Sequence, residues 1–153
     1  MELFLTLVGI FIWTFGEYML HRFIFHSEDH WLPNNPKVLA HHFMLHGIHH
    51  AFPMDRYRLV FPILPGYLLI TAFFITPIKM VFFEEWQATL IAGTMIGYVL
   101  YDLIHYFLHY SQPKDGYWRN LKIYHMQHHY KNGQQGFGVS SKFWDYVLFT
   151  PID

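Results

Sequence analysis

Three long apolar stretches, separated by polar segments, form the dominant pattern of this chain. Residues 3–20 contain a single charge, Glu17, and residues 59–78 contain none. Residues 86–104 are free of charge until Asp102. A helix needs roughly 20 apolar residues to cross a bilayer core of about 30 Å, so the pattern predicts three transmembrane helices.

Prolines in the second stretch and small residues in the third add detail to the helices predicted there. Pro62, Pro65 and Pro77 predict kinked or non-helical ends for the second helix. Small residues in the third stretch predict close approach of another helix; they are Ala88, Ala92, Gly93 and Gly97.

The polar segments carry very different numbers of basic residues. Lys79 is the only lysine or arginine in residues 79–85, whereas nine lie in residues 21–58 and 110–153. The positive-inside rule therefore predicts that the two long segments are cytoplasmic and that the N-terminus is outside.

The N-terminal stretch lacks a basic region and a small-residue cleavage site, so we interpret it as a retained helix rather than a signal peptide. "QPKDGYW" and "KNGQQGFG", in the last segment, indicate turns.

Composition narrows the class of protein. The chain is 53% hydrophobic, 21% aromatic and 14% charged, which is typical of a membrane protein, and its 153 residues form at most one domain. A net charge of -1 argues against nucleic-acid binding. The chain contains no cysteine, so disulfides, thiolate ligands and cysteine nucleophiles are excluded, and any metal must be bound by nitrogen and oxygen.

Ten of the thirteen histidines fall into four regularly spaced groups. The groups are His21 and His26; His46, His49 and His50; His105 and His109; and His125, His128 and His129. Residues three or four apart share one face of a helix, so three of the groups can each direct imidazoles toward one point. The first pair is separated by about 140° around a helix, so we expect it to straddle the frayed end of the first span.

Metal binding is the simplest explanation for so many imidazoles at one face of the membrane. Neutral rings facing one another would make a poor core, because each carries one donor and one acceptor that need partners. Two transition-metal ions with about five nitrogen ligands each would remove that difficulty, but imidazole binds iron, zinc, copper or nickel alike. The combined pattern predicts an all-α integral membrane protein with about three transmembrane helices and a cytoplasmic helical cap that carries a dinuclear histidine metal site.

The histidines and acids outside these groups have weaker roles. We expect His30 and His41 to be solvated. Asp102, one turn before His105, and His42, one turn before His46, are candidates for orienting a ligand ring. Helix packing or capping is an equally good interpretation of Asp102.

The histidine motifs resemble those of a known family. They are His-x4-His from 21, His-x2-His-His from 46, His-x3-His from 105 and His-x2-His-His from 125. In that order they resemble the integral-membrane fatty acid hydroxylases of the sterol desaturase and hydroxylase superfamily. "FMLHGIHHAFPMDRYRLVFP" and "YDLIHYFLHYS" look like its fatty acid 2-hydroxylase branch.

The resemblance implies a chemistry and a set of partners. It implies two iron ions held by the ten grouped histidines, with zinc possible in purified material, and dioxygen as co-substrate. The expected reaction uses two electrons to place one oxygen atom at C2 of a long-chain fatty acyl lipid.

We expect residues 1–153 to form a single membrane-embedded fatty acid hydroxylase domain without a fused cytochrome b5 domain. The electron donor would then be separate, such as cytochrome b5 or a ferredoxin with its reductase. Members of the family often have four spans, whereas the pattern here predicts three. The metal site would lie on the cytoplasmic face of a bacterial inner membrane or of the endoplasmic reticulum.

Two alternatives remain open from the sequence. The same histidine motifs occur in sterol and carotenoid hydroxylases and desaturases, whose substrate channels differ. A membrane metal-binding or metal-transport protein is a different class, although its ligands would be expected near the bilayer midplane rather than at one edge.

Overall fold

A computed structural model of the chain describes residues 1–152, and within that range all regular structure is helical. The helices in chain order are α1 (Glu2–Leu20), α2 (Pro36–His42), α3 (Ile48–Ala51), α4 (Ile63–Ile70), α5 (Thr76–Val81), α6 (Glu84–Tyr110), α7 (Gly116–Tyr130) and α8 (Phe143–Val147). Three π-helical segments continue or precede them: η1 (His21–Phe25), η3 (Phe43–Gly47) and η5 (Thr71–Ile75). The 3-10 turns are η2 (Ser27–Asp29) and η4 (Arg56–Arg58).

Three helical segments are long and apolar enough to cross a membrane, which confirms the predicted number. They cover Glu2–Phe25, Arg56–Val81 and Glu84–Tyr110, so each is longer than the apolar stretch that predicted it. The first gains η1 and the third runs on to Tyr110. Both extensions carry histidines beyond the apolar stretch, at the same end of the molecule.

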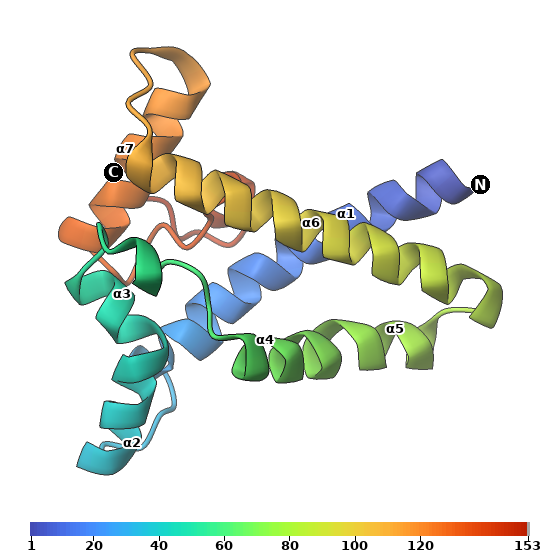
Figure 1. Ribbon diagram of the computed structural model, residues 1–153, viewed down its shortest axis with the longest axis horizontal. Coiled ribbons are helices and arrows are strands. Elements are labelled where there is room, and N and C mark those ends of the chain that lie inside the picture. Colours follow the sequence, from blue (N-terminus) through green and yellow to red (C-terminus); the bar gives the residue numbers. More distant parts are fainter. Residues whose placement is uncertain (153) are drawn as a thin grey trace.

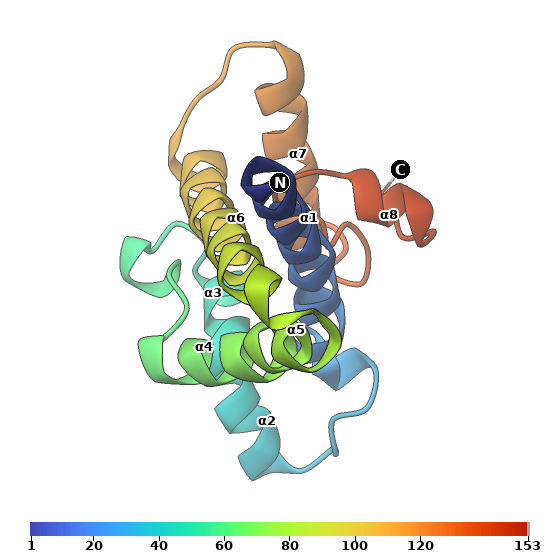
Figure 2. The ribbon, with the colours of Figure 1, turned by 90° about the vertical axis from the view of Figure 1, so that its right-hand side faces the viewer.

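The spans lie side by side, with the histidine-bearing segments gathered at one end (Figure 1). α1 and α6 run in the same direction, and α4 and α5 return in the opposite direction. The N-terminus and the α5–α6 connection lie at the end away from α2, α3 and α7. Viewed along the spans, α7 and α2 extend to opposite sides of the bundle (Figure 2).

Glycines allow α1 and α6 to pack closely. A Cβ atom on Gly93 would clash with the carbonyl oxygen of Thr6, and one on Gly97 would lie 2.5 Å from the Cβ of Trp13. The prediction of close helix approach is therefore confirmed at these two glycines. Ala88 and Ala92, by contrast, are exposed.

Pro62 and Pro77 have different positions in the second span: Pro62 precedes a helix, whereas Pro77 lies inside a continuous helical segment. α4 begins directly after Pro62, and Pro77 occupies the first turn of α5. The π segment η5 precedes Pro77, where a proline removes one hydrogen bond donor from a continuing helix. The second span thus continues past Pro77 with a wider turn instead of a break.

Candidate metal centre

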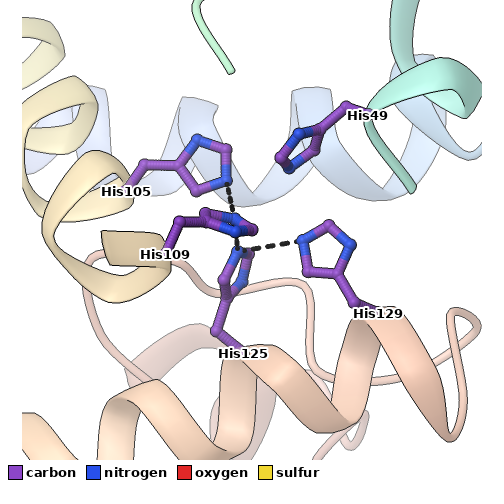
Figure 3. A group of neighbouring side chains, drawn as sticks. All are labelled: His49, His105, His109, His125 and His129. Atoms are coloured by element: carbon purple, nitrogen blue, oxygen red, sulfur yellow. Dashed lines mark hydrogen bonds between the residues drawn. The ribbon is translucent and has the colours of Figure 1, made fainter. Parts of the chain in front are cut away.

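Five histidines from three separate helices form the first cluster, named here group A. Its members are His49, His105, His109, His125 and His129, and one ring nitrogen of each lies within 4.8 Å of those of the others. Figure 3 shows the rings converging from α3, α6 and α7 on a common point. Lys122 holds α7 against the end of α6, because its Nζ donates to the carbonyl oxygens of Leu108 (2.6 Å) and His109 (3.1 Å).

The spacing of the ring nitrogens in group A fits a metal ion better than a hydrogen-bonded cluster. His109 Nε2 lies 3.1 Å from His105 Nε2 and 3.0 Å from His125 Nε2, which in turn lies 3.1 Å from His129 Nε2. A ring nitrogen has one proton or one lone pair in the ring plane and cannot serve two neighbours at once. Two nitrogens at about 2.1 Å from one ion and at right angles are about 3.0 Å apart.

His49 gives the strongest evidence that a ligand belongs between these rings. It is buried, and within residues 1–152 neither of its ring nitrogens has a hydrogen-bond partner. Its ring centroid lies 4.9, 4.8 and 4.7 Å from those of His105, His109 and His129. Because a buried imidazole without a partner is costly, this residue fits the role of a metal ligand.

The other five histidines of the motifs form a second cluster, named here group B. Ring nitrogens of His21, His26, His46 and His50 lie within 4.8 Å of one another. His128 lies beside them, with its Nε2 3.1 Å from His26 Nε2 and its ring centroid 4.7 Å from that of His21. The structure thus brings the ten predicted histidines together as two adjacent groups of five.

The π turn η1 explains how the pair with the least helical spacing joins one group. The backbone N–H of His26 donates to the carbonyl oxygen of His21, five residues earlier, at 3.1 Å. This wider turn brings residues five apart to the same side, and the two ring centroids are 5.1 Å apart. The pair does lie on either side of the end of the first span, but that end is not frayed: the span continues to Phe25 as a hydrogen-bonded π turn.

Burial keeps the histidines of the cap neutral. It lowers the pKa of His49 and of His128 to about 4, and that of His26 to about 3. The pKa of His50 falls to about 2, since four neighbouring histidines of the site add to the effect of burial. Burial also lowers the pKa values of His46, His125 and His129. Neutral imidazole is the form that binds a metal, so these rings are ready to do so at physiological pH.

The residues expected at the margin of the site have different positions. His42 Nε2 lies 3.2 Å from a Glu28 carboxylate oxygen, and the other oxygen of Glu28 is 3.8 Å from His26 Nδ1. The Nδ1 of His105 has no hydrogen-bond partner among the described residues, Asp102 included. His30 and His41 are exposed, as expected for solvated residues.

Sequence reasoning did not identify the aromatic residues that join the histidines to a cavity. Phe25 stacks on His46 with ring centroids 4.9 Å apart, and Tyr101 stacks on His105 at 5.6 Å. Both rings line an apolar cavity of about 400 Å³ between α1, α4 and α6. Aromatic residues are so frequent in this chain that neither was distinguishable from packing residues.

Known proteins resemble this chain over nearly its whole length. Residues 6–150 match the fatty acid hydroxylase family. The ceramide very long chain fatty acid hydroxylase SCS7 of Saccharomyces cerevisiae is 49% identical over 150 residues, which are 96% of this chain and 38% of the relative. The fatty acid 2-hydroxylase of Mus musculus is 43% identical, with 97% of this chain and 39% of the relative covered. The dihydroceramide fatty acyl 2-hydroxylase FAH1 of Arabidopsis thaliana is also 43% identical, covering 95% and 60%.

A solved structure shares the fold. Full-length scs7p, in which only the hydroxylase domain is visible, superposes with a TM-score of 0.89 at 47% identity and covers 99% of this chain and 56% of that one. The chain spans about two fifths of the length of the yeast and mouse relatives. The family match extends over every histidine of groups A and B. This chain belongs to the fatty acid hydroxylase family.

Proposed function

We propose that this chain is the hydroxylase domain of a non-haem di-iron monooxygenase that hydroxylates C2 of a long-chain fatty acyl lipid. The relatives named above act on ceramide, dihydroceramide or fatty acids, and the acyl chain is common to all three. The net reaction converts one C–H bond to C–OH: the acyl CH2 group, dioxygen, two electrons and two protons give the hydroxylated lipid and one water. Bound iron would supply the activation of dioxygen, which acid–base side chains cannot perform.

The observation that carries this proposal is the contact between the apolar cavity and both histidine groups. Tyr101, in the cavity wall, stacks on His105 of group A, and Phe25, in the same wall, stacks on His46 of group B. An acyl chain that fills the cavity would therefore lie next to both groups. C2 is the first methylene after the head carbonyl, so the head would stay at the histidine end while the tail lies among the spans.

The residues of the chain have three tasks in this reaction. Groups A and B would hold the two ions through ten neutral imidazoles. The cavity lining, which includes Leu69, Ile70 and Met95, positions the acyl chain and excludes water from the reacting carbon. Zinc exceeds ferrous iron in affinity for nitrogen sites, so purified protein that contains zinc is compatible with an iron enzyme.

The electrons come from a partner protein, which we propose to be cytochrome b5 or a ferredoxin with its reductase. No cysteine is present in these 153 residues, so none can bind an iron–sulfur cluster through thiolates. We also propose that the metal centre faces the cytoplasm, as in a bacterial inner membrane or the endoplasmic reticulum. Nine basic residues lie in the segments at the histidine end, against Lys79 alone in the segment at the other end.

Lipid mass spectrometry tests the proposed function. A host without 2-hydroxy fatty acids should gain them on expression of the wild-type chain together with an electron donor, and should not gain them with His128→Ala. Metal content is measured in parallel for both proteins. Folded, metal-loaded protein that yields no 2-hydroxy lipid with a reduced donor would reject the C2 assignment. Oxidised sterols or carotenoids in its place would indicate the related hydroxylases, and metal flux without oxygen consumption would indicate a transporter.

A further inference from the structure

Two histidines of group B are oriented by backbone carbonyls from one irregular segment, residues 135–140, named here the C-terminal loop. His128 Nδ1 lies 2.7 Å from the carbonyl oxygen of Gln135, and His21 Nδ1 lies 2.6 Å from that of Phe137. A carbonyl oxygen only accepts hydrogen bonds, so each Nδ1 must carry the proton. Both rings are thereby fixed in the tautomer whose Nε2 lone pair is free for a metal.

A carboxylate from the first span holds one end of this loop. Glu17 Oε1 accepts from the backbone N–H groups of Val139 (2.9 Å) and Ser140 (2.7 Å). The hydroxyl of Ser140 donates to the other oxygen, Oε2. Glu17 is buried at 5% exposure and lies one helical turn before His21, so neighbouring turns of the first span carry the histidine and the carboxylate that secures its carbonyl partner.

A second carboxylate, Asp145 of α8, holds the middle of the loop. Its Oδ1 accepts from the backbone N–H of Phe137 and its Oδ2 from that of Gly138, both at 2.9 Å. The hydroxyl of Thr150 also donates to Oδ1 at 2.9 Å, and Asp145 is fully buried. The N–H of Phe137 thus binds Asp145 while its carbonyl oxygen binds His21, so one peptide segment connects the carboxylate to the ligand.

The close approach of the carboxylate to the loop requires glycine. A Cβ atom on Gly138 would lie 2.8 Å from Asp145 Oδ2 and would clash with the carbonyl oxygen of Ser141. Gly136 adopts a φ of 74°, which side-chain-bearing residues rarely adopt. Gly136 and Gly138 of "GQQGFG" therefore allow these close backbone contacts, in addition to the turn that the composition of the segment indicates.

We propose that Glu17 and Asp145 are positioning residues for the metal of group B, acting through the carbonyl oxygens of the C-terminal loop on His21 and His128. The inference rests on the proposed function in requiring bound metal. It adds that the two carboxylates support group B selectively. The carbonyl oxygens of Gln135 and Phe137 pair with His128 and His21, which both belong to group B. Each carboxylate accepts three hydrogen bonds. At Asp145 both oxygens accept from a backbone N–H, so an amide would turn its NH2 toward one of these donors. At Glu17 an amide would lack the negative charge that strengthens the two backbone hydrogen bonds.

Metal release from the purified full-length chain in detergent tests this inference. Wild-type protein, Asp145→Asn and Glu17→Gln are loaded with Zn²⁺, and the release of each ion to a chelator is followed. We expect one of the two ions to be released about 10–100-fold faster in both variants, with the other unchanged, because that is the usual cost of losing an outer hydrogen-bond partner. In a His49→Ala background, the ion that remains should be the sensitive one. In a His26→Ala background, the remaining ion should be insensitive.

Thr14→Val is the matched control. Trp144 Nε1 donates to Thr14 Oγ1 at 3.1 Å, so this variant also weakens the attachment of the C-terminal region to α1, but outside the loop. It should release both ions at the wild-type rate. Ser140→Ala is a milder variant that removes one donor to Glu17 and leaves both backbone contacts. It should release one ion faster than wild type and the other at the wild-type rate, and it tests the role of Glu17 if Glu17→Gln does not fold.

The outcomes separate this inference from the proposed function. Equal acceleration for both ions, or wild-type release in the folded variants, overturns the positioning role. Wild-type protein that retains no ion overturns both proposals. If wild-type protein holds two ions but makes no 2-hydroxy lipid, the proposed activity fails while the release rates still decide the role of the carboxylates.

Discussion

His26 Nε2 lies 3.1 Å from His128 Nε2, although 102 residues separate the two along the chain. His26 follows the first span directly, and His128 belongs to α7, after the last span. The two halves of the chain therefore meet within the site itself. Group A is similarly composite, since α3, α6 and α7 each contribute to it.

His49→Ala should abolish metal binding in group A while group B keeps its ion. His49 is buried and lies in ring contact with His105 and His129 of group A. We expect the metal content of purified protein to fall from about two ions per chain to about one, with loss of hydroxylation. Elemental analysis by mass spectrometry measures the content. His41→Ala is the control, because His41 is exposed and its Nδ1 pairs with the carbonyl oxygen of Lys37, one turn earlier in α2; it should keep both ions.

Ile70→Trp should change the chain length of the product. Ile70 lines the cavity of about 400 Å³, and a larger side chain there would occupy part of the space available to an acyl tail. The distribution of 2-hydroxy lipids should shift toward shorter chains, as measured by mass spectrometry. Leu103→Trp adds the same bulk at a position that is 61% exposed on α6 and should leave the distribution unchanged. An identical shift in both variants would assign the effect to the membrane environment instead of the cavity.

Gly93→Val should weaken the packing of α1 against α6. Any side chain at Gly93 meets the backbone of Thr6, and overpacking of this kind costs roughly 1–3 kcal/mol. The midpoint of thermal unfolding in detergent should fall. Ala92→Val places the same side chain one position away, on the exposed side of the helix, and should unfold near the wild-type midpoint. Equal midpoints for the two variants would contradict the packing described here.

Metal-free protein should lose stability below about pH 6.5. The pKa values of His49 and His128 in the folded chain are about 4, and the unfolded values are about 6.5. Between these values the unfolded chain binds more protons, so the free energy of unfolding falls as pH decreases and is unaffected above about pH 6.5. Each such histidine contributes a loss of about 1.4 kcal/mol per pH unit. Chemical unfolding of the chelator-treated protein from pH 7.5 to 4.5 measures the slope; a flat profile would show that the rings are solvated.

Much of this architecture could be predicted from the sequence, because membrane spans and histidine motifs follow simple rules of length and spacing. The three apolar stretches predicted three spans, and the spacing at Gly93 and Gly97 predicted a close helix contact. Helical periodicity did not predict that the side chains of His21 and His26 lie on the same side, because it assumes α-helical geometry. The π turn there changes the angle between the two side chains, and local composition does not predict such a turn.

The supporting parts of the site could not be predicted, since they are made by contacts between distant segments. "KNGQQGFG" indicated a turn, but the carbonyl oxygens that it presents to His21 and His128 belong to the backbone and leave no trace in residue type. Glu17 appeared only as a charge within an apolar stretch. Its partners lie at Val139 and Ser140, which no spacing rule connects to it.

The position of Glu17 has a consequence for how the protein is made. The donors that satisfy its carboxylate are synthesised 122 and 123 residues later, after all three spans. Until then the first helix carries an unsatisfied carboxyl group in or near the bilayer, where such a group is costly. A chain truncated before residue 139 would lack both backbone donors, so its first helix would keep a carboxyl group without these partners.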